Sequence, residues 1–498
     1  MFAKLKKLLS SYWPLLLILV VVGTLFFIRL GRNPLWDWDE CIYAQYSKEI
    51  KATGDVITNH WNSSIRMEKP TLFFALMQIP YLFGINEFTT RILTAIFGLL
   101  LIVFTYLLSQ KFFSRTTAVL STLLLLTGES VIIYSLRLNT ELPFATLVLA
   151  GVYFFLSARE KRFYSYLAGV LFGVAVMIKG LSVQFLPPLF LATFINFKKE
   201  KLIHFLEAMA AFLVVILPWH IAQFVMHGGE FYKVYIYENI IQKVNNPVEF
   251  HFGGRLYYIK LFATELLPWI GLSVVLPIYY LIHFKIFLKK KTMLAELKKQ
   301  EVIFTVLLFV LVPLVLLTRA QTKIAWYIIS IYPFLCIYLG YCLTMLLDLA
   351  KKKYKAFYTV CFTLLVVLIS ADAGRLMMNE IRPLENKVNL SHREKALVEV
   401  RKQPQKQLDY LVQFSERRAR ETLASNLATS TTFIYGGNPC AVYSTGKKVN
   451  YYYEIPTFQK RVKSGHGLYL LENGDLWTVK DLPVEKVYGD TDFTLFTN

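Results

Sequence analysis

Three carboxylates stand within four residues directly after the first apolar run of the chain. They are Asp37, Asp39 and Glu40, in the segment NPLWDWDECIYAQYSKEIKATGD. Neighbouring carboxylates can abstract a proton or hold a cation beside a charged substrate, so Asp39 and Glu40 are predicted catalytic residues. Asp37 and Glu40 also have the spacing of a capping box, so one of the three carboxylates can serve only to start a helix.

The residues after this acidic cluster have the spacing of a helix. Ile42, Tyr46 and Ile50 recur every four residues and form an apolar stripe. Gly54 suits the end of such a helix. We expect an amphipathic helix at the membrane surface, with its carboxylates turned towards the protein.

Further ionisable residues occur at the ends of apolar runs, where a charge is costly and therefore often functional. Glu68 and Lys69 precede Pro70, which suits the first turn of a helix, and an anion would relieve the conflict between a lysine and the helix dipole there. An ion pair within the loop is the alternative. Arg137 and Glu141 are four residues apart, so they are expected to share a helix face, where they can also pair with each other.

Three later positions complete the set of charged candidates. Lys179 ends an apolar run with no acid near it in the sequence, and a lysine that reaches the membrane surface is the alternative. Arg319 and Lys323 are four residues apart, a like-charge pair that favours an anion. His251, in the segment HFGG, is either a surface residue or, with Glu68, an oxygen and nitrogen pair for zinc or magnesium.

Composition places these residues in a membrane protein. The chain has 498 residues, of which 55% are hydrophobic and 18% charged, whereas a soluble chain has about a quarter charged residues. This excludes a disordered or an ordinary cytosolic protein. The net charge of +20 would favour a nucleic-acid partner in a soluble protein, but the apolar excess argues against one.

The cysteines lack CxxC or metal spacing, so we expect packed thiols and no disulfide framework or zinc site: Cys41, Cys336, Cys342, Cys361 and Cys440.

Apolar runs long enough to cross a bilayer recur along the first 370 positions. The stretch 71–84 is short and contains Pro80, so it is either half-buried or an extra span. We therefore predict about 11–13 transmembrane helices. Eleven runs lie near 12–30, 88–108, 116–134, 139–157, 163–178, 182–197, 203–221, 263–284, 302–318, 324–347 and 356–372.

The distribution of basic residues predicts the orientation. Lysine and arginine concentrate in alternate loops, near 4–7, 111–115, 159–162, 198–201, 285–299 and 351–355. Short cytoplasmic loops are enriched in these residues, so the N-terminus is predicted to be cytoplasmic. The first run is too long for a signal-peptide core and has no small-residue cleavage site, so it should be a retained span. Segments 31–87, 222–262 and 373–498 are then external.

The composition changes after Ala373. We predict a transmembrane catalytic domain, 1–372, and a small extracytoplasmic α/β domain, 373–498. A helix is expected near 392–427. Strands are expected at TTFIYGG, CAVYSTG, GLYLLENG and WTVKDL, where short apolar runs are bounded by glycine and asparagine.

Five patches, taken in order, resemble the bacterial aminoarabinose transferase family. These are GT-C glycosyltransferases related to dolichyl-phosphate-mannose protein O-mannosyltransferases. The matching patches are DE..YA...KEI...GD with MEKPTL and YLFGINEFTTRI, then RLNTE, KGL, YENIIQKV with a later histidine, and the Lys323, Tyr327 and Pro333 spacing. The chain departs from the family pattern at Thr71, Val56, Glu141, Ala325 and Trp326.

The resemblance implies a polytopic GT-C fold and an enzyme that moves a sugar from a polyprenyl-phosphate donor to lipid A, a protein or a surface glycan. The reaction would take place on the outer face of the bacterial inner membrane. Asp39 is the implied base or acceptor-orienting carboxylate, supported by Glu141, while Glu68 and His251 would hold a divalent zinc or magnesium ion. Tyr43 and Glu238 are further matching residues. The implied phosphate-binding residues are Lys69, Arg137, Lys179, Arg255, Arg319, Lys323 and Tyr327.

The expected partners are the lipid-linked donor, a lipid or protein acceptor and membrane lipids, with no nucleic acid, and the chain is expected to be a monomer. The sequence has no GxGxxG fingerprint, which agrees with a donor that is not a nucleotide. Two alternatives remain. One is a polymerase or ligase of lipid-linked oligosaccharides. The other is a transporter or flippase, although the charges gather in external loops rather than at mid-membrane.

Overall fold

The computed structural model describes most of the chain. The described residues are 2–32, 35, 38–195, 198–248, 251–282, 300–353, 355–381, 392–404, 407–411, 439–445, 448–452, 454–465, 467–489 and 493–497. They form two compact units. The first unit is Met1–Gly31, Met67–Phe73 and Arg91–Arg382, and the second is Arg32–Arg66, Phe74–Thr90 and Pro383–Asn498. Most of the loop predicted to be the first external one therefore belongs to the same unit as the C-terminal residues.

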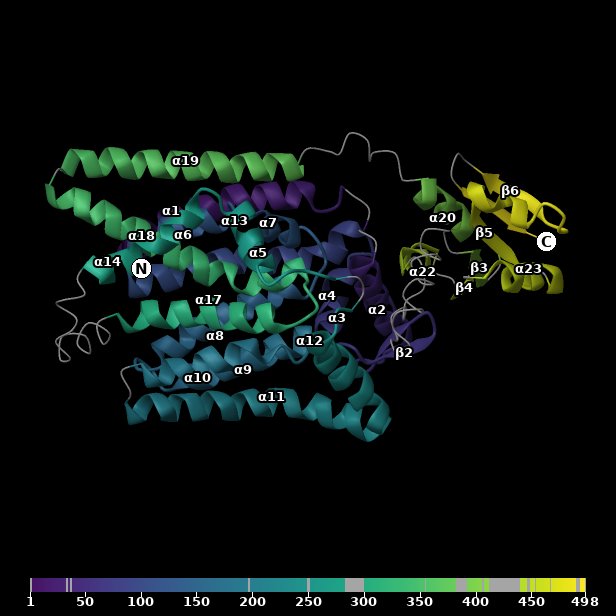
Figure 1. Cartoon of the computed structure of the whole chain (residues 1–498), viewed down its shortest axis with the longest axis horizontal. Helices are drawn as coiled ribbons and strands as arrows, with labels where there is room; N and C mark the ends of the chain where they lie inside the picture. Colours follow the sequence, from purple (N-terminus) through teal and green to yellow (C-terminus); the bar gives the residue numbers. More distant parts are fainter. Residues whose placement is uncertain are drawn as a thin grey trace. The chain divides into compact units, whose positions relative to one another are not determined.

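The first unit is built from helices. They are α1 (Phe2–Arg29), α5 (Glu87–Phe112), α6 (Arg115–Leu125), α7 (Glu129–Ser135), α8 (Glu141–Ser157), α9 (Phe163–Lys179), α10 (Leu186–Phe194), α11 (Lys199–Phe231), α12 (Lys243–Asn245), α13 (Tyr257–Glu265), α14 (Val275–Ile282), α17 (Glu301–Arg319), α18 (Tyr332–Lys353) and α19 (Lys355–Ile381). A π-helix, η2 (Tyr232–Gln242), follows α11. The 3-10 helices are η1 (Val183–Phe185), η3 (Trp269–Val274) and η4 (Ala325–Ser330). Helix α9 packs against both α8 and α11 (Figure 1).

The polytopic helical class is confirmed, with fewer long helices than predicted. Among the described residues, six helices are long and apolar enough to cross a membrane, or up to eight if two bent pairs are counted. Three predicted runs, near 139–157, 163–178 and 182–197, fold as apolar helices of 10–17 residues. Hydropathy identified these segments correctly as apolar, but it does not determine the residues at which a helix begins and ends.

The two bent pairs explain the rest of the difference. Helices α6 and α7 are bent by 73°, and the pair Tyr257–Glu265 and Trp269–Tyr279 is bent by 115°. At the first bend Gly128 lies against the Tyr332 ring, where a Cβ would come within 2.9 Å. A side chain at this position would displace the ring, so the glycine allows the close contact.

The first loop begins with helix α2 (Asp39–Thr53), which confirms the predicted helix, and its apolar stripe is buried. Gly54 ends it in the left-handed conformation, at φ 74°. Trp38 occupies the position before the helix, and an indole cannot accept a hydrogen bond from the helix amides. Asp37, the predicted capping residue, lies outside the described residues.

A hairpin and two short helices complete this loop. They are β1 (Asn59–Trp61), β2 (Ser64–Arg66), α3 (Leu72–Leu76) and α4 (Gln78–Tyr81). Asn62 and Ser63 turn the hairpin with positive φ angles of 53° and 66°, as a two-residue type I′ turn requires. The apolar stretch 71–84, predicted as either half-buried or an extra span, thus forms only the short helices α3 and α4.

The C-terminal part is a small α/β domain, as predicted. Its sheet has the order β4-β3-β5-β7-β6, with β3 parallel to β4 and β5, and β7 antiparallel to β5 and β6. Its strands are β3 (Gln407–Leu411), β4 (Lys448–Tyr452), β5 (Leu468–Glu472), β6 (Glu485–Gly489) and β7 (Phe493–Thr497), and its helices are α20 (His392–Lys402), α22 (Pro439–Thr445) and α23 (Ile455–Ser464). Phe458 and Val462 of α23 pack into a buried apolar cluster with Leu411, Tyr469 and Leu471 of the sheet.

Several element predictions in this domain are wrong. The segment CAVYSTG forms helix α22, where Pro439 at the first helical position favours a helix start. WTVKDL continues a 3-10 helix, η5 (Asn473–Thr478), into a turn. The helix expected near 392–427 ends at Lys402 and is followed by β3. The strand at GLYLLENG is confirmed as β5, and TTFIYGG lies outside the described residues.

Candidate functional site

A buried lysine forms the centre of the candidate site in the first unit. Lys179 is the last residue of α9, and only 9% of it is exposed. Its ammonium lies 4.9 Å from the Phe144 ring centroid and 4.7 Å from the Tyr327 ring centroid. Aromatic faces stabilise a cation while leaving its N–H groups available for an anion. Two residues that are predicted to bind phosphate, Lys179 and Tyr327, are thus in contact.

Thr140 connects a second lysine to a carboxylate of the same cluster. Lys69 Nζ donates to Thr140 Oγ1 at 3.3 Å, and Thr140 Oγ1 donates to Glu141 Oε2 at 3.4 Å. The Thr140 backbone N–H also donates to Glu141 Oε2, at 3.2 Å. The charges of Glu141 and Lys69 also act on the Lys179 ammonium. The cluster therefore carries two cations and one buried carboxylate.

The backbone brings two sequence motifs together at this point. Gly180 has φ 104°, and the position of a Cβ built on it lies 3.8 Å from Pro70 Cδ and 3.6 Å from the Tyr235 hydroxyl. The MEKP and KGL motifs are therefore adjacent in the fold. Tyr235, in the π-helix η2, is hydrogen-bonded to His220 Nε2 of α11 at 3.1 Å. π-Helices occur frequently at functional sites.

The segments 243–251 and 321–323 are joined by main-chain hydrogen bonds. The backbone N–H of Gln321 donates to Val244 O at 2.9 Å, and that of Thr322 donates to Lys243 O at 3.1 Å. The N–H of Lys323 donates to His251 O at 2.9 Å. The predicted residues His251 and Lys323 are therefore held together by main-chain hydrogen bonds.

The Lys323 side chain has a specific set of acceptors. Its ammonium donates to the carbonyls of Leu317 and Thr318, at 3.0 and 2.6 Å, and to that of Ala320. These carbonyls lie at the C-terminus of α17, where a cation is favourable. Burial lowers the pKa of Lys323, while the three carbonyls favour its charged form. In this arrangement Lys323 anchors the loop after α17 to the end of that helix. Binding of the donor phosphate by Lys323 stays a prediction.

Trp326, one of the departures from the family pattern, packs on the histidine. Its ring centroid lies 5.9 Å from that of His251 and 6.0 Å from that of Tyr134. An aromatic residue between them restricts the orientation of the imidazole. A small residue at this position could not make this contact.

The other predicted cations are on separate elements. Arg255 is exposed just before α13, and Arg319 is the exposed last residue of α17. Arg137 is half-buried in the turn between α7 and α8, so the expected helix face shared with Glu141 is not formed. The reason is Asn139, which accepts from the Leu142 N–H at 2.9 Å and donates to the Arg137 carbonyl at 2.8 Å.

The predicted carboxylates of the first loop lie in the second unit. Asp39 and Glu40 are in the first turn of α2, and Glu40 is buried. Tyr43, one turn further, packs its ring 5.4 Å from that of Phe74. Glu238, the remaining match, is half-buried in the π-helix η2 of the first unit.

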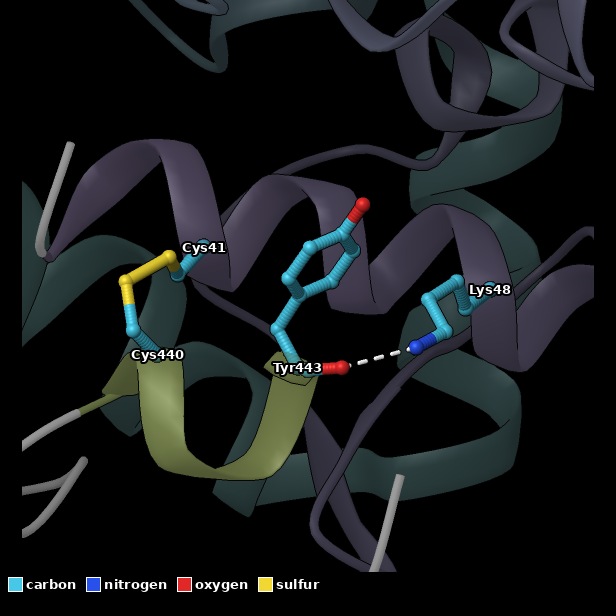
Figure 2. Close-up of a disulfide and its surroundings, with 4 residues drawn as sticks. All are labelled: Cys41, Lys48, Cys440 and Tyr443. Carbon is cyan, nitrogen blue, oxygen red and sulfur yellow. Dashed lines mark hydrogen bonds between the residues drawn. A yellow bond between two sulfur atoms is a disulfide. The ribbon is translucent and has the colours of Figure 1, made fainter. Parts of the chain in front are cut away.

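The expectation of no disulfide is wrong. Cys41, directly after Glu40, is bonded to Cys440 of α22, with a Cα–Cα distance of 4.9 Å (Figure 2). The two residues are 399 positions apart, so spacing in the sequence gives no signal for this pair. Cys336, Cys342 and Cys361 are free thiols, as expected.

The residues present do not make a metal site from protein ligands alone. Within the described part of the chain, no group of three or more histidine, cysteine, aspartate or glutamate side chains gathers around a common point. Glu68 and His251 would supply two ligands, fewer than a closed zinc site needs.

Two contributors to the site have no sequence signal of their own. Thr140 is one of many threonines in the chain, and its role is visible only from the positions of Lys69 and Glu141. Lys243, in α12, acts on Lys179 electrostatically and donates to Asn239 at 3.0 Å. Lys243 lies in a polar stretch of the sequence without distinctive spacing, so no motif indicates its role.

Replacing Thr140 by valine should lower the sugar transfer that the resemblance implies by about tenfold, because the lost hydroxyl contacts two charged groups. Valine has nearly the same shape, so the packing around this buried residue is kept. Initial rates of transfer in membranes would measure the effect. Thr140→Ser keeps the hydroxyl and should retain activity, and full activity in Thr140→Val would contradict the assignment.

Comparison with known proteins confirms the resemblance drawn from the motifs. Residues 68–221 match the family described as dolichyl-phosphate-mannose-protein mannosyltransferase. A protein of Aquifex aeolicus is 28% identical over 334 residues, which cover 65% of this chain and 62% of that protein. An undecaprenyl phosphate-alpha-4-amino-4-deoxy-L-arabinose arabinosyl transferase of Pseudomonas fluorescens is 25% identical over 359 residues, 69% of this chain and 62% of that protein. The matched region thus spans about 62% of the length of these relatives.

A solved structure confirms the GT-C fold. ArnT from Cupriavidus metallidurans, bound to undecaprenyl phosphate, superimposes with a TM-score of 0.71 over 97% of each chain. The two sequences are 16% identical, so this likeness establishes the fold. The chain is therefore a multi-pass membrane protein with the GT-C fold.

Proposed function

We propose that this chain transfers a sugar from a polyprenyl-phosphate donor to an acceptor at the outer face of the inner membrane. The observation that carries the proposal is the cluster of buried Lys179 and Glu141 with half-buried Lys69, in which Lys179 lies between two aromatic rings. A lipid phosphate brings the negative charge that such a cluster would neutralise. The similarity to undecaprenyl phosphate-aminoarabinose transferases supports the same donor class.

The two lysines would act on the leaving group. When the bond between the phosphate and the anomeric carbon breaks, negative charge develops on the phosphate, and fixed cations lower the energy of that state. Lys179 and Lys69 are oriented before the donor binds, because their contacts come from the protein. Tyr327 would hold Lys179 and add a hydroxyl to the phosphate. Four further cations remain predicted contributors to the positive electrostatic potential at the phosphate: Arg137, Arg255, Arg319 and Lys323.

The acceptor side of the reaction needs a base. Asp39 is the proposed carboxylate that accepts or orients the acceptor proton, with Glu40 beside it in the first turn of α2. Glu141 is proposed to orient Lys69 through Thr140. Tyr43 would support α2 from within, by packing on Phe74. Glu238 is proposed to belong to the site only because it lies in the π-helix η2.

The disulfide supports the proposed orientation. A structural disulfide persists in an oxidising compartment such as the periplasm and is rare in the cytosol. The bond between Cys41 and Cys440 requires the first loop and the C-terminal domain to be on the same side of the membrane. The basic loops predicted to be cytoplasmic would then be on the other side, together with the N-terminus.

Mass spectrometry of lipid A, glycoproteins and polyprenyl-phosphate sugars, in cells with and without the gene, tests the proposed function. We expect one acceptor pool to lose a sugar in the deletion strain and the lipid-linked donor to accumulate. A plasmid copy of the gene should restore both pools. Movement of donor across the membrane without any change in an acceptor pool would instead indicate a transporter and contradict the proposal.

A further inference from the structure

The disulfide attaches the C-terminal domain to the helix that carries the proposed base. Cys41 is the third residue of α2, directly after Asp39 and Glu40, and it is 1% exposed. Its partner Cys440 is in the short helix α22 of the C-terminal domain. The covalent bond is therefore within the same helical turn as both carboxylates.

A second contact joins the same two helices further along. Lys48 is two turns after Cys41 on the same face of α2, and its ammonium donates to the Tyr443 carbonyl at 2.8 Å. The ammonium also lies 4.4 Å from the centroid of the Tyr443 ring. Figure 2 shows this ring against α2, between Cys41 and Lys48. The two contacts together fix the direction of α2 as well as its position.

A third contact joins the hairpin that follows α2 to the edge of the C-terminal sheet. The Asn62 side chain donates to the Val449 carbonyl at 2.7 Å and accepts from the Val449 N–H at 2.9 Å. It satisfies both backbone groups of one residue of β4, which is an edge strand of its sheet. The Trp61 ring stacks on Tyr451, with centroids 6.5 Å apart and planes at 7°.

The other side of α2 is packed as well. The Tyr46 ring lies 5.1 Å from that of Phe74, and Gln78 Nε2 donates to the Ser47 carbonyl at 2.9 Å. Lys51 donates to the Tyr81 carbonyl at 3.1 Å. Helix α2 is thus held between α3 and α4 on one side and the C-terminal domain on the other.

We infer that the C-terminal domain is a positioning element for the reaction: Cys440 holds the first turn of α2, while Tyr443 and Val449 hold its later part and the hairpin that follows it, and together they fix the orientation of Asp39 and Glu40. The inference rests on the proposed function for the role of these carboxylates. Cys41, Cys440, Lys48 and Asn62 act through α2 and are positioning residues. A displacement of a catalytic group by about 1 Å can cost on the order of a hundredfold in rate, so a domain that restrains one helix turn can control the turnover.

The experiment compares the full-length wild type with Cys440→Ser in membranes. We expect kcat to fall by about tenfold or more while KM for the lipid-linked donor changes less than about twofold, because the donor phosphate is held by other residues. Cys361→Ser removes a free cysteine of α19 and is the matched control, with unchanged kcat and KM. Unchanged kcat in Cys440→Ser would overturn the inference.

A second experiment breaks the disulfide in the folded wild type, so its result does not depend on whether the variant folds. Dithiothreitol reduces the bond in the folded wild type: the reagent is oxidised to its cyclic disulfide, and Cys41 and Cys440 each receive one electron and one proton. Kcat should fall as in Cys440→Ser and recover on reoxidation. Lys48→Met, which removes the second contact, should lower kcat in the same direction. A fully reduced wild type with unchanged kcat would overturn the inference.

Hydrogen exchange separates this inference from the proposed function. Amides 42–47 of α2, the first to have acceptors within the helix, should exchange faster in the reduced protein and in Cys440→Ser, whatever reaction the protein catalyses. Faster exchange with no sugar transfer in the wild type would contradict the proposed function and leave the attachment of α2 intact. Equal exchange in both forms, with transfer present, would contradict the attachment alone.

Discussion

Replacing Lys179 by methionine should lower sugar transfer by about a hundredfold or more, as expected for the loss of one preorganised group that stabilises developing charge. Lys179 is buried between Phe144 and Tyr327, and it is more enclosed than Lys69, the other cation of the cluster, which is half-buried. Methionine keeps much of the length and apolar volume, so the aromatic contacts remain. Transfer rates from a polyprenyl-phosphate sugar, in membranes with equal protein abundance, would measure the loss.

The matched control for this variant is Lys161→Met. Lys161 is exposed in the turn before α9, so it has the same chemistry without the burial. It should retain wild-type transfer. Retained transfer in Lys179→Met would show that this ammonium does not act on the leaving phosphate.

Asp39→Asn should reduce kcat by about a hundredfold to ten-thousandfold, the range expected for loss of a general base. Asparagine is nearly isosteric and keeps an oxygen acceptor, so α2 should fold as in the wild type. KM for the donor should change little, because the change affects the acceptor side of the reaction. The kinetic constants with saturating acceptor would measure the effect.

Glu49→Gln is the control on the same helix. Glu49 accepts from Gln45 at 2.8 Å and lies near the other end of α2 from Asp39. Its neutralisation should leave kcat unchanged. If Asp39→Asn retained full turnover, or if Glu49→Gln lost as much, the assignment of the base to Asp39 would be contradicted.

Much of the site in the first unit was predictable from the sequence. Burying a charge in apolar surroundings costs free energy, so a charged residue beside an apolar run is a candidate for function. Lys69, Glu141, Lys179 and Tyr327 were each named from motifs or from charge at a helix end, and the structure places all four in one cluster. A charge is tolerated there only if it is paired, solvated or used. Position in the sequence relative to an apolar run therefore carries information about function.

The attachment of α2 to the C-terminal domain was not predictable. Cys41 and Cys440 are 399 residues apart, and cysteine spacing does not determine the pairing of distant residues. The segment CAVYSTG has the composition of a strand, yet it forms α22, which is held by the disulfide and by Lys48. Tertiary contacts outweighed local propensity in this segment.

The same limit applies to side chains whose role depends on distant partners. Lys323 was assigned to a phosphate on the basis of its motif, but its ammonium contacts three carbonyls at the end of α17. Thr140 had no signal in the sequence, since hydroxyl residues are frequent in apolar helices. Only the positions of Lys69 and Glu141 on either side of it make its role visible.

Binding of undecaprenyl phosphate to the purified protein, measured by native mass spectrometry, tests the central claim most directly. The wild type should bind the lipid phosphate, and Lys69→Met with Lys179→Met should weaken binding by at least about tenfold, since charge-assisted contacts are lost. Undecaprenol, which lacks the phosphate, should bind both proteins equally. Equal affinity of both proteins for undecaprenyl phosphate would contradict the claim that this cluster holds the donor phosphate.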